Sequence, residues 1–227
     1  MQRRQFTSGV LTLGGLWAVS ARAAGITESD AALGIRAALE RGAIAAVALL
    51  GRNGGFLDNP KVKIQLPGYL NEAAKVLKFT GQQRRVDELV TAMNRAAEAA
   101  VPEAKALLVN AVRSMSVEDG RQILSGGDNS ATRFFSDKTR APLGVKFLPI
   151  VTKATERVSL ADKYNKVAGQ VASLGLVNKD EANIQNYITG KALDGLFLVI
   201  GEEERKIRKD PVGTGSAILK KVFGSLN

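Results

Sequence analysis

Four helix-start signals recur along this sequence and limit the folds that it can adopt. In each of them a Ser, Thr or Asn is followed three residues later by an acid, at Thr27 and Asp30, Ser116 and Asp119, Ser159 and Asp162, and Asn178 and Glu181. The first side chain can accept a free backbone N–H of the new helix, while the acid reaches back to the cap residue and favours the positive helix end. These capping boxes predict a chain built from successive helices.

Apolar residues between the signals recur at the spacing of amphipathic helices. Two such stripes flank Pro102, and they consist of Val86, Leu89, Val90, Met93, Ala97 and Ala100, then Ala104, Leu107, Leu108, Ala111, Val112 and Met115. Another apolar run, 193–200, is too short to cross a bilayer and too apolar for a solvated face. We therefore expect an all-α, single compact domain of about eight or nine helices over 25–227, with 86–115 and 186–207 at its centre.

One stretch, "GRNGGFLDNPKVKIQLPGYL" at 51–70, breaks the helical pattern. Between Pro60 and Pro67, polar and apolar residues alternate with the period of two that an extended chain shows. The sequence offers no obvious partner strand. We therefore expect an extended arm that packs over the helices, and its 56–70 part is a candidate contact in an oligomer.

Two prolines, Pro142 and Pro149, follow the helix that is expected to begin near Ser130. A proline inside a helix removes one backbone hydrogen bond and clashes with the preceding turn. Two of them seven residues apart predict that the helix is interrupted and becomes a kinked passage.

Residues 1–24 have the layout of a cleaved export signal, with a basic start, an apolar stretch and a small-residue end. Arg3 and Arg4, followed by Gln and Phe, fit the twin-arginine type. The small-residue end predicts cleavage near Ala23 or Ala24. No later stretch approaches the length of an apolar membrane span, so we expect a periplasmic or secreted protein that is not membrane-spanning.

The chain contains no Cys and no His. This excludes disulfides, zinc sites built from these residues, thiolate nucleophiles and every triad that needs an imidazole base, and we expect neither a metal nor another cofactor. Loss of the three arginines of the signal region lowers the net charge from +10 to +7, which favours an anionic envelope surface or protein partner, or serves solubility alone. Aromatic residues form only 5% of the chain, too few for base stacking, so nucleic-acid binding is not expected.

The best candidate for a binding site is the segment "GGDNSATR" at 126–133. Gly126, Gly127 and Asp128 lie in a loop between two capped helices, and Arg133 follows shortly after them. Such loops can present backbone N–H groups to a phosphate or carboxylate. Asp128 could instead occupy the same N–H groups and cap the helix itself, so both interpretations stay open. The spacing of a calcium-binding loop is absent.

Two further candidates, Asp194 and Glu203, lie near the apolar run 193–200. Burial there could raise the pKa of a carboxyl group and make it a general acid. The sequence does not distinguish such a group from a buried salt bridge to Arg133 or Lys191.

The run of three glutamates at 202–204 is followed by basic residues. On a continuous helix, Glu202 with Lys206 and Glu204 with Arg208 have the spacing of i,i+4 ion pairs. Such pairs are typical of a solvated face.

Several blocks of the chain resemble, in order, the bacterial family called domain of unknown function 4197. They are "GFLDNPKVKIQLP", "NRAAEAAVPEAKALL", "ILSGGDNSATRFF", "FLPIV" and "KALDGLFLVIGEEERKIRKDP". The resemblance covers essentially all of the chain after the signal, with a departure from the family pattern at Pro142. It implies an exported helical protein and transfers neither an activity nor a catalytic residue.

We interpret the chain as a non-enzymatic envelope protein that binds an anionic or apolar ligand or a protein partner. One alternative is a hydrolase or lyase with a carboxylate acid/base pair, for which Asp128 and Glu203 would have to lie about 5 to 10 Å apart. Another alternative is a structural protein that forms an oligomer through a large apolar patch.

Overall fold

The structure, a computed structural model, describes residues 28–68, 83–156 and 183–210, and all regular secondary structure in these ranges is helical. The elements are α1 (Glu28–Leu50), α3 (Gln83–Ala100), the 3₁₀ turn η1 (Val101–Glu103), α4 (Ala104–Arg113), α5 (Val117–Ser125), α6 (Ser130–Thr155) and α8 (Ile184–Lys209). The predicted all-α class is confirmed. The total of about eight or nine helices stays a prediction, because several expected helices lie outside the described residues, as does the expected signal.

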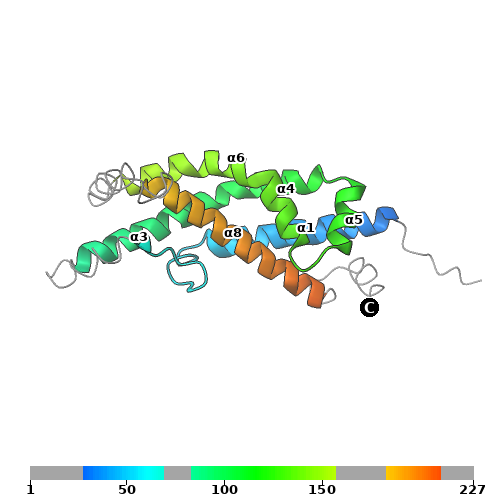
Figure 1. The fold of residues 1–227 in the computed structure, drawn as a ribbon, viewed down its shortest axis with the longest axis horizontal. Coiled ribbons are helices and arrows are strands. Elements are labelled where there is room, and N and C mark those ends of the chain that lie inside the picture. Colours follow the sequence, from blue (N-terminus) through cyan, green and yellow to red (C-terminus); the bar gives the residue numbers. More distant parts are fainter. Residues whose placement is uncertain (1–27, 69–82, 157–182, 211–227) are drawn as a thin grey trace, which may run out of the picture.

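The helices run mostly along the long axis of the molecule (Figure 1). α6 and α8 lie side by side in opposite directions and form the most extensive helix pair, and α8 also packs against α1 and α3. The short α5 packs against α1 and α6 at one end of the molecule. α8 is thus the central helix of the fold, as its apolar run predicts.

The core is built from the apolar stripes that the sequence predicts. Met93 and Ala97 of α3 are fully buried, and so are Ile188 and Leu196 of α8. Leu198 is an exception within the apolar run, since 43% of it is exposed. Of the helices described, none combines the length and the hydropathy that crossing a membrane requires.

α6 is one continuous helix although it contains both Pro142 and Pro149. The expectation that these prolines interrupt it is therefore wrong. Both prolines are exposed, and so are Lys138 and Val145 four residues before them, so the carbonyls that lack a backbone donor can be hydrated. Packing holds the helix from the opposite side, through a buried stripe of Phe135, Thr139, Leu143, Phe147 and Val151.

The predicted arm consists of turns and bends at 51–62 and of chain without regular secondary structure at 63–67, and two side chains of α3 hold it. Asn94 is fully buried and replaces a partner strand: its Oδ1 accepts the Ile64 N–H at 2.8 Å, and its Nδ2 donates to the Ile64 carbonyl at 2.9 Å. Glu98 Oε1 accepts the N–H groups of Phe56 and Leu57, each at 3.0 Å. The arm therefore finds its backbone partners on a helix.

The arm also packs against α8. A Cβ atom at Gly195 would lie 2.7 Å from the ring of the fully buried Phe56 and 3.3 Å from Val62, so a glycine is needed for this close approach. The Tyr187 hydroxyl donates to the Gln65 carbonyl at 3.0 Å. The arm thus lies between α3 and α8.

Candidate functional site

The α5 helix begins with the capping box that the sequence predicts. Ser116 Oγ accepts the Asp119 N–H at 3.0 Å, and Asp119 Oδ2 accepts the Ser116 N–H at 2.8 Å. Hydrogen bonds from the Ser116 hydroxyl and N–H lower the pKa of Asp119 below its ordinary value, and the charge of Lys138 adds to the effect. Asp119 therefore stays ionised and faces Lys138 across the gap between α5 and α6.

The loop between α5 and α6 contains three of the predicted site residues. Gly126 follows the last residue of α5, and the Gly127 carbonyl accepts the Ser130 N–H at 3.0 Å. Asp128 is exposed, and Asn129, the residue before α6, makes no capping hydrogen bond with its side chain. The first N–H groups of α6 must therefore have an acceptor from elsewhere.

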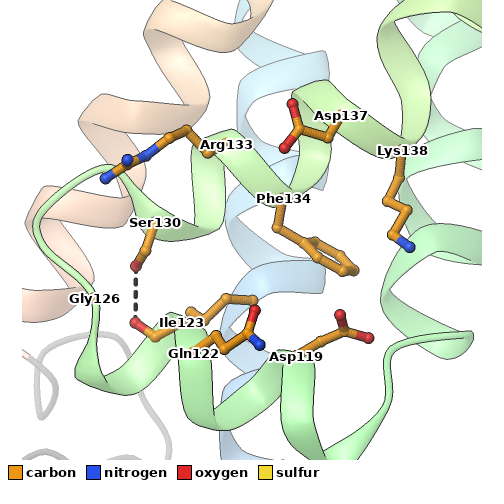
Figure 2. A pocket seen from close by; sticks show the side chains of 9 residues that line it. All are labelled: Asp119, Gln122, Ile123, Gly126, Ser130, Arg133, Phe134, Asp137 and Lys138. Carbon is orange, nitrogen blue, oxygen red and sulfur yellow. Dashed lines mark hydrogen bonds between the residues drawn. The ribbon is translucent and has the colours of Figure 1, made fainter.

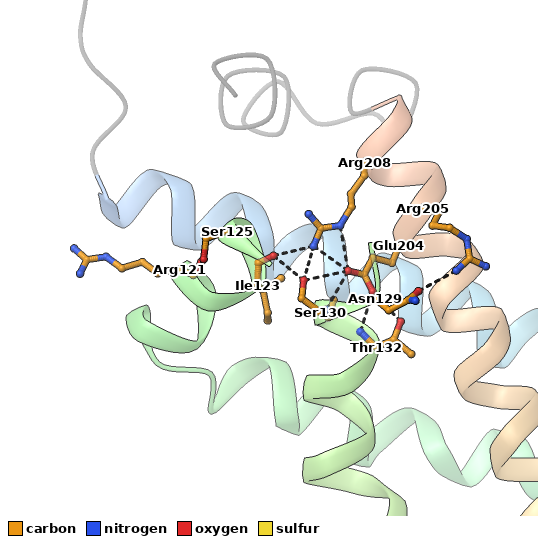
Figure 3. A network of polar contacts seen from close by, with 10 residues as sticks. Arg121, Ile123, Ser125, Asn129, Ser130, Thr132, Glu204, Arg205 and Arg208 are labelled. Atoms are coloured by element: carbon orange, nitrogen blue, oxygen red, sulfur yellow. Dashed lines mark hydrogen bonds and ion pairs between the residues drawn. The ribbon is translucent and has the colours of Figure 1, made fainter. Parts of the chain in front are cut away.

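That acceptor is Glu204 of α8 (Figure 3). One of its carboxylate oxygens accepts the Ala131 N–H at 3.0 Å, and the other accepts the Thr132 N–H at 2.9 Å and the Thr132 hydroxyl at 2.8 Å. Only 4% of the Glu204 side chain is exposed. Its carboxylate lies at the positive end of the α6 dipole, which attracts a negative charge. The interpretation of Asp128 as the cap of α6 is therefore wrong.

Arg208, one turn further along α8, neutralises this carboxylate and connects it to α5. Its guanidinium lies 2.9 Å from Glu204 and donates to the Ile123 carbonyl at 2.8 Å and to Ser130 Oγ at 2.6 Å. The Ser130 hydroxyl in turn donates to the Ile123 carbonyl at 2.8 Å. The end of α5, the start of α6 and α8 thus meet in one polar network, which we call the junction.

The sequence pattern indicated Glu203 as the candidate acid, whereas the acid that is buried in the junction is the next residue, Glu204. The predicted pair of Glu204 and Arg208 forms, but it is buried and not part of a solvated face. A signal for this was present, because Ile200, Glu204 and Ile207 continue one helical stripe and all three are buried.

The neighbouring glutamates differ from the prediction as well. Lys206 pairs with Glu203 at 2.6 Å, not with Glu202. Glu202 instead pairs with Lys61 of the arm at 2.6 Å. The three glutamates therefore point to three different parts of the structure.

A groove of about 370 Å³ lies between α5 and the first half of α6 (Figure 2). It is lined by Asp119, Gln122, Ile123, Gly126, Ser130, Arg133, Phe134, Asp137 and Lys138. The predicted residues Gly126 and Arg133 are therefore brought together here. Gly127 and Asp128 do not belong to the lining.

Phe134 forms the apolar centre of the groove and points toward α5. The side chain is half-buried and meets the Phe135 ring edge-on, with 5.9 Å between the ring centroids. Arg133, Asp137 and Lys138 belong to the same lining, and their side chains make no hydrogen bond or ion pair with another residue of the described ranges. The groove therefore combines an aromatic surface with available charges of both signs.

The remaining candidates, Asp194 and Glu203, lie outside this groove. Asp194 pairs with Arg140 of α6 at 2.6 Å, and of its two predicted partners Lys191 is the one in contact, at 3.8 Å. Glu203 packs beside Gly42 of α1. Within the residues that the structure describes, no three or more acidic side chains form a group that could hold a metal ion.

Two contacts described above, that of α3 with the arm and that of α8 with the start of α6, are formed by the sequence blocks that carry the family resemblance. Residues 25–224 match the family described as "Protein of unknown function (DUF4197)". The chain belongs to this family. No curated protein and no solved structure matches it. In this DUF4197 protein, the arm block meets the α3 block at Asn94 and Glu98, and the Gly-Gly-Asp block meets the α8 block at Glu204.

Proposed function

We propose that this DUF4197 protein is a non-enzymatic binding protein of the cell envelope, and that its α5–α6 groove holds a short peptide segment of a protein partner. The main support is the composition of the groove. Half-buried Phe134 shares this lining with Arg133, Asp137 and Lys138, whose side chains form no hydrogen bond or ion pair within the described parts of the chain. Such a surface suits a peptide that carries an apolar side chain next to charged ones.

The size and charge of the groove indicate how long the bound peptide segment is and which charges it carries. A volume of about 370 Å³ is at the small end of ligand pockets, which favours one side chain with its flanking backbone. The amide of Gln122 can pair with that backbone. The lining carries two cations, Arg133 and Lys138, and two acids, Asp119 and Asp137. Because Ser116 already occupies Asp119 with hydrogen bonds, acidic residues beside the apolar one are favoured as partners of the two cations.

The two buried glutamates support a non-enzymatic role. Burial raises the pKa of Glu98, but hydrogen bonds from the Leu57 N–H, Arg95 and the Phe56 N–H, with the charge of Arg95, outweigh it and lower the pKa below its ordinary value. Glu204 accepts hydrogen bonds on both oxygens. A general acid needs a free approach to substrate, and the oxygens of these two groups bind backbone N–H groups of the fold instead.

The proposal can be tested by NMR titration of the ¹⁵N-labelled protein with three capped tripeptides, Glu-Phe-Glu, Glu-Ser-Glu and Lys-Phe-Lys. We expect Glu-Phe-Glu to shift the amide signals of 119–138, because it offers both the apolar side chain and the acidic flanks. The other two peptides each lack one of these features and should bind more weakly. The proposal fails if no peptide shifts these signals, or if all three do so equally.

Matched variants locate the binding. Arg133→Ala should weaken Glu-Phe-Glu binding, whereas Arg113→Ala, which removes an exposed arginine from α4, should not. Phe134→Ser should abolish binding, with Leu148→Ser on the exposed side of α6 as its control. The melting temperature of each variant shows whether it is folded.

Export is a separate part of the proposal, and it rests on the signal pattern of 1–24. The wild-type protein should be recovered from the periplasm or the medium, with an N-terminus near Ala24 or Gly25. The double substitution Arg3→Lys and Arg4→Lys should leave an uncleaved protein in the cytoplasm. Uncleaved wild-type protein in the cytoplasm would contradict export, whereas export of the double variant would contradict only the twin-arginine route.

A further inference from the structure

A second cavity lies between α8 and the arm. It has a volume of about 340 Å³, and its charged lining residues are Lys61, Lys63, Lys191 and Asp194. On the arm, Lys61 and Lys63 alternate with the buried Val62. Both lysines line the cavity, which we call the arm cleft.

Two of the charges at the arm cleft are neutralised by partners. Lys61 pairs with Glu202 at 2.6 Å, and Asp194 pairs with Arg140 at 2.6 Å. Lys63 has no ion pair within the described residues.

Lys191 completes the wall of the cleft that α8 provides. Its Nζ lies 3.8 Å from one carboxylate oxygen of Asp194, whereas Arg140 lies 2.6 Å from the other. The same Nζ lies 5.7 Å from the centre of the Tyr187 ring. Lys63, which has no ion pair in the described ranges, and Lys191, which has only this longer ion pair, therefore place two positive charges on the arm wall and the α8 wall of one cleft.

We propose that the arm cleft binds a phosphate monoester. Such a group carries a charge of about −1.5 to −2 at neutral pH, which matches the two charges of Lys63 and Lys191. The Tyr187 ring lies beside the site, held by the hydrogen bond from its hydroxyl to Gln65. Leu198, an exposed apolar residue in the same lining, provides a surface for the organic part of the ligand.

A phosphate monoester can come from a small soluble molecule or from a lipid headgroup, and two assays separate these sources. Isothermal titration with glycerol 3-phosphate tests the soluble ligand. Co-sedimentation with phosphatidylcholine vesicles, with and without phosphatidic acid, tests the headgroup. Binding in either assay should weaken as salt is added, because the site is open to solvent.

The test variant is Lys63→Ala with Lys191→Ala, and its control is Lys146→Ala with Lys153→Ala, which removes the same charge from exposed positions of α6. We expect the test variant to bind at least about tenfold more weakly, because each lysine supplies a charge-assisted contact. The control should bind as the wild type does. Binding to the vesicles alone would support the proposal and identify the headgroup as the source.

Three results would overturn the proposal. The first is that the wild type binds in neither assay. The second is that the test variant binds as tightly as the wild type. The third is that the control variant loses as much affinity as the test variant. Because the arm cleft shares no lining residue with the α5–α6 groove, peptide binding to the groove can succeed or fail independently.

Discussion

Glu98 and Glu204 are both buried, and each is paired with an arginine on its own helix, yet they hold different kinds of partner. Glu98 of α3 lies 2.6 Å from Arg95 and accepts two N–H groups from turns of the arm. Glu204 of α8 lies 2.9 Å from Arg208 and accepts two N–H groups from the start of α6. In both cases a helix supplies an acceptor to a segment that is distant in sequence.

The difference lies in how many side chains each partner needs. The first N–H groups of a helix converge and carry its positive dipole end, so the single carboxylate of Glu204 is sufficient for the start of α6. The backbone N–H and carbonyl groups of the arm do not converge on one point. It needs Asn94, Glu98 and Tyr187 at separate positions along its length. A helix end can thus be held at one point, whereas irregular chain must be held group by group.

The largest effect should come from Glu204→Ala. It leaves Arg208, whose side chain is only 17% exposed, without its charge partner and leaves two N–H groups without an acceptor. We expect a loss of about 3–5 kcal/mol in the free energy of unfolding, measured by urea denaturation.

The control for this prediction is Glu88→Ala. This variant breaks an exposed i,i+4 pair with Arg84 and should cost about 0.5 kcal/mol or less. Similar losses in the two variants would show that the junction is no more than a surface ion pair.

Glu98→Ala should have a smaller and more local effect. We expect a loss of about 2–4 kcal/mol, because Arg95 is 40% exposed and stays partly hydrated when its partner is removed. Hydrogen exchange of the Phe56 and Leu57 amides should accelerate more than that of the Ala131 amide. Equal acceleration at both places would contradict the separation of arm and junction.

Gly195→Ala tests the packing of the arm against α8 without touching a hydrogen bond. The new Cβ would lie 2.7 Å from the Phe56 ring, so we expect a loss of about 1–3 kcal/mol. Gly190→Ala is the matched control on the same helix, because its Cβ would meet no atom within 4 Å. It should stabilise the protein by about 0.5–1 kcal/mol, and thermal unfolding would show shifts of opposite sign.

The smallest expected effect is the pH dependence of stability that comes from the ionisation of Glu98. Its pKa in the folded protein is below the ordinary value of 4.5, so its stabilising effect is complete above pH 4.5 and is lost as the pH falls through the lower folded value. The free energy of unfolding of the wild type should therefore fall more steeply below pH 4.5 than that of Glu98→Gln. Glu88→Gln should keep the wild-type slope, and an unchanged slope in Glu98→Gln would assign the acid sensitivity to other groups.

Local patterns predicted much of the fold and little of the candidate site. The stripe through Met93, the capping box at Ser116 and the alternation in the arm depend on residues within a few positions of each other, and all three are present in the structure. The site depends on pairs that are far apart. Glu204 and Ala131 are separated by 73 positions, so a sequence pattern confined to one loop pointed to Asp128 instead.

By itself, the sequence determined the helical class, most of the buried faces and the DUF4197 family. Periodicity and capping are properties of short segments, and they act before any two helices meet. The tertiary structure alone decided that α6 passes through Pro142 and Pro149, that Asn94 takes the place of a strand, and which of three adjacent glutamates is buried. These outcomes depend on which faces of distant helices come into contact, because burial and hydrogen bonding across such a contact outweigh local preference.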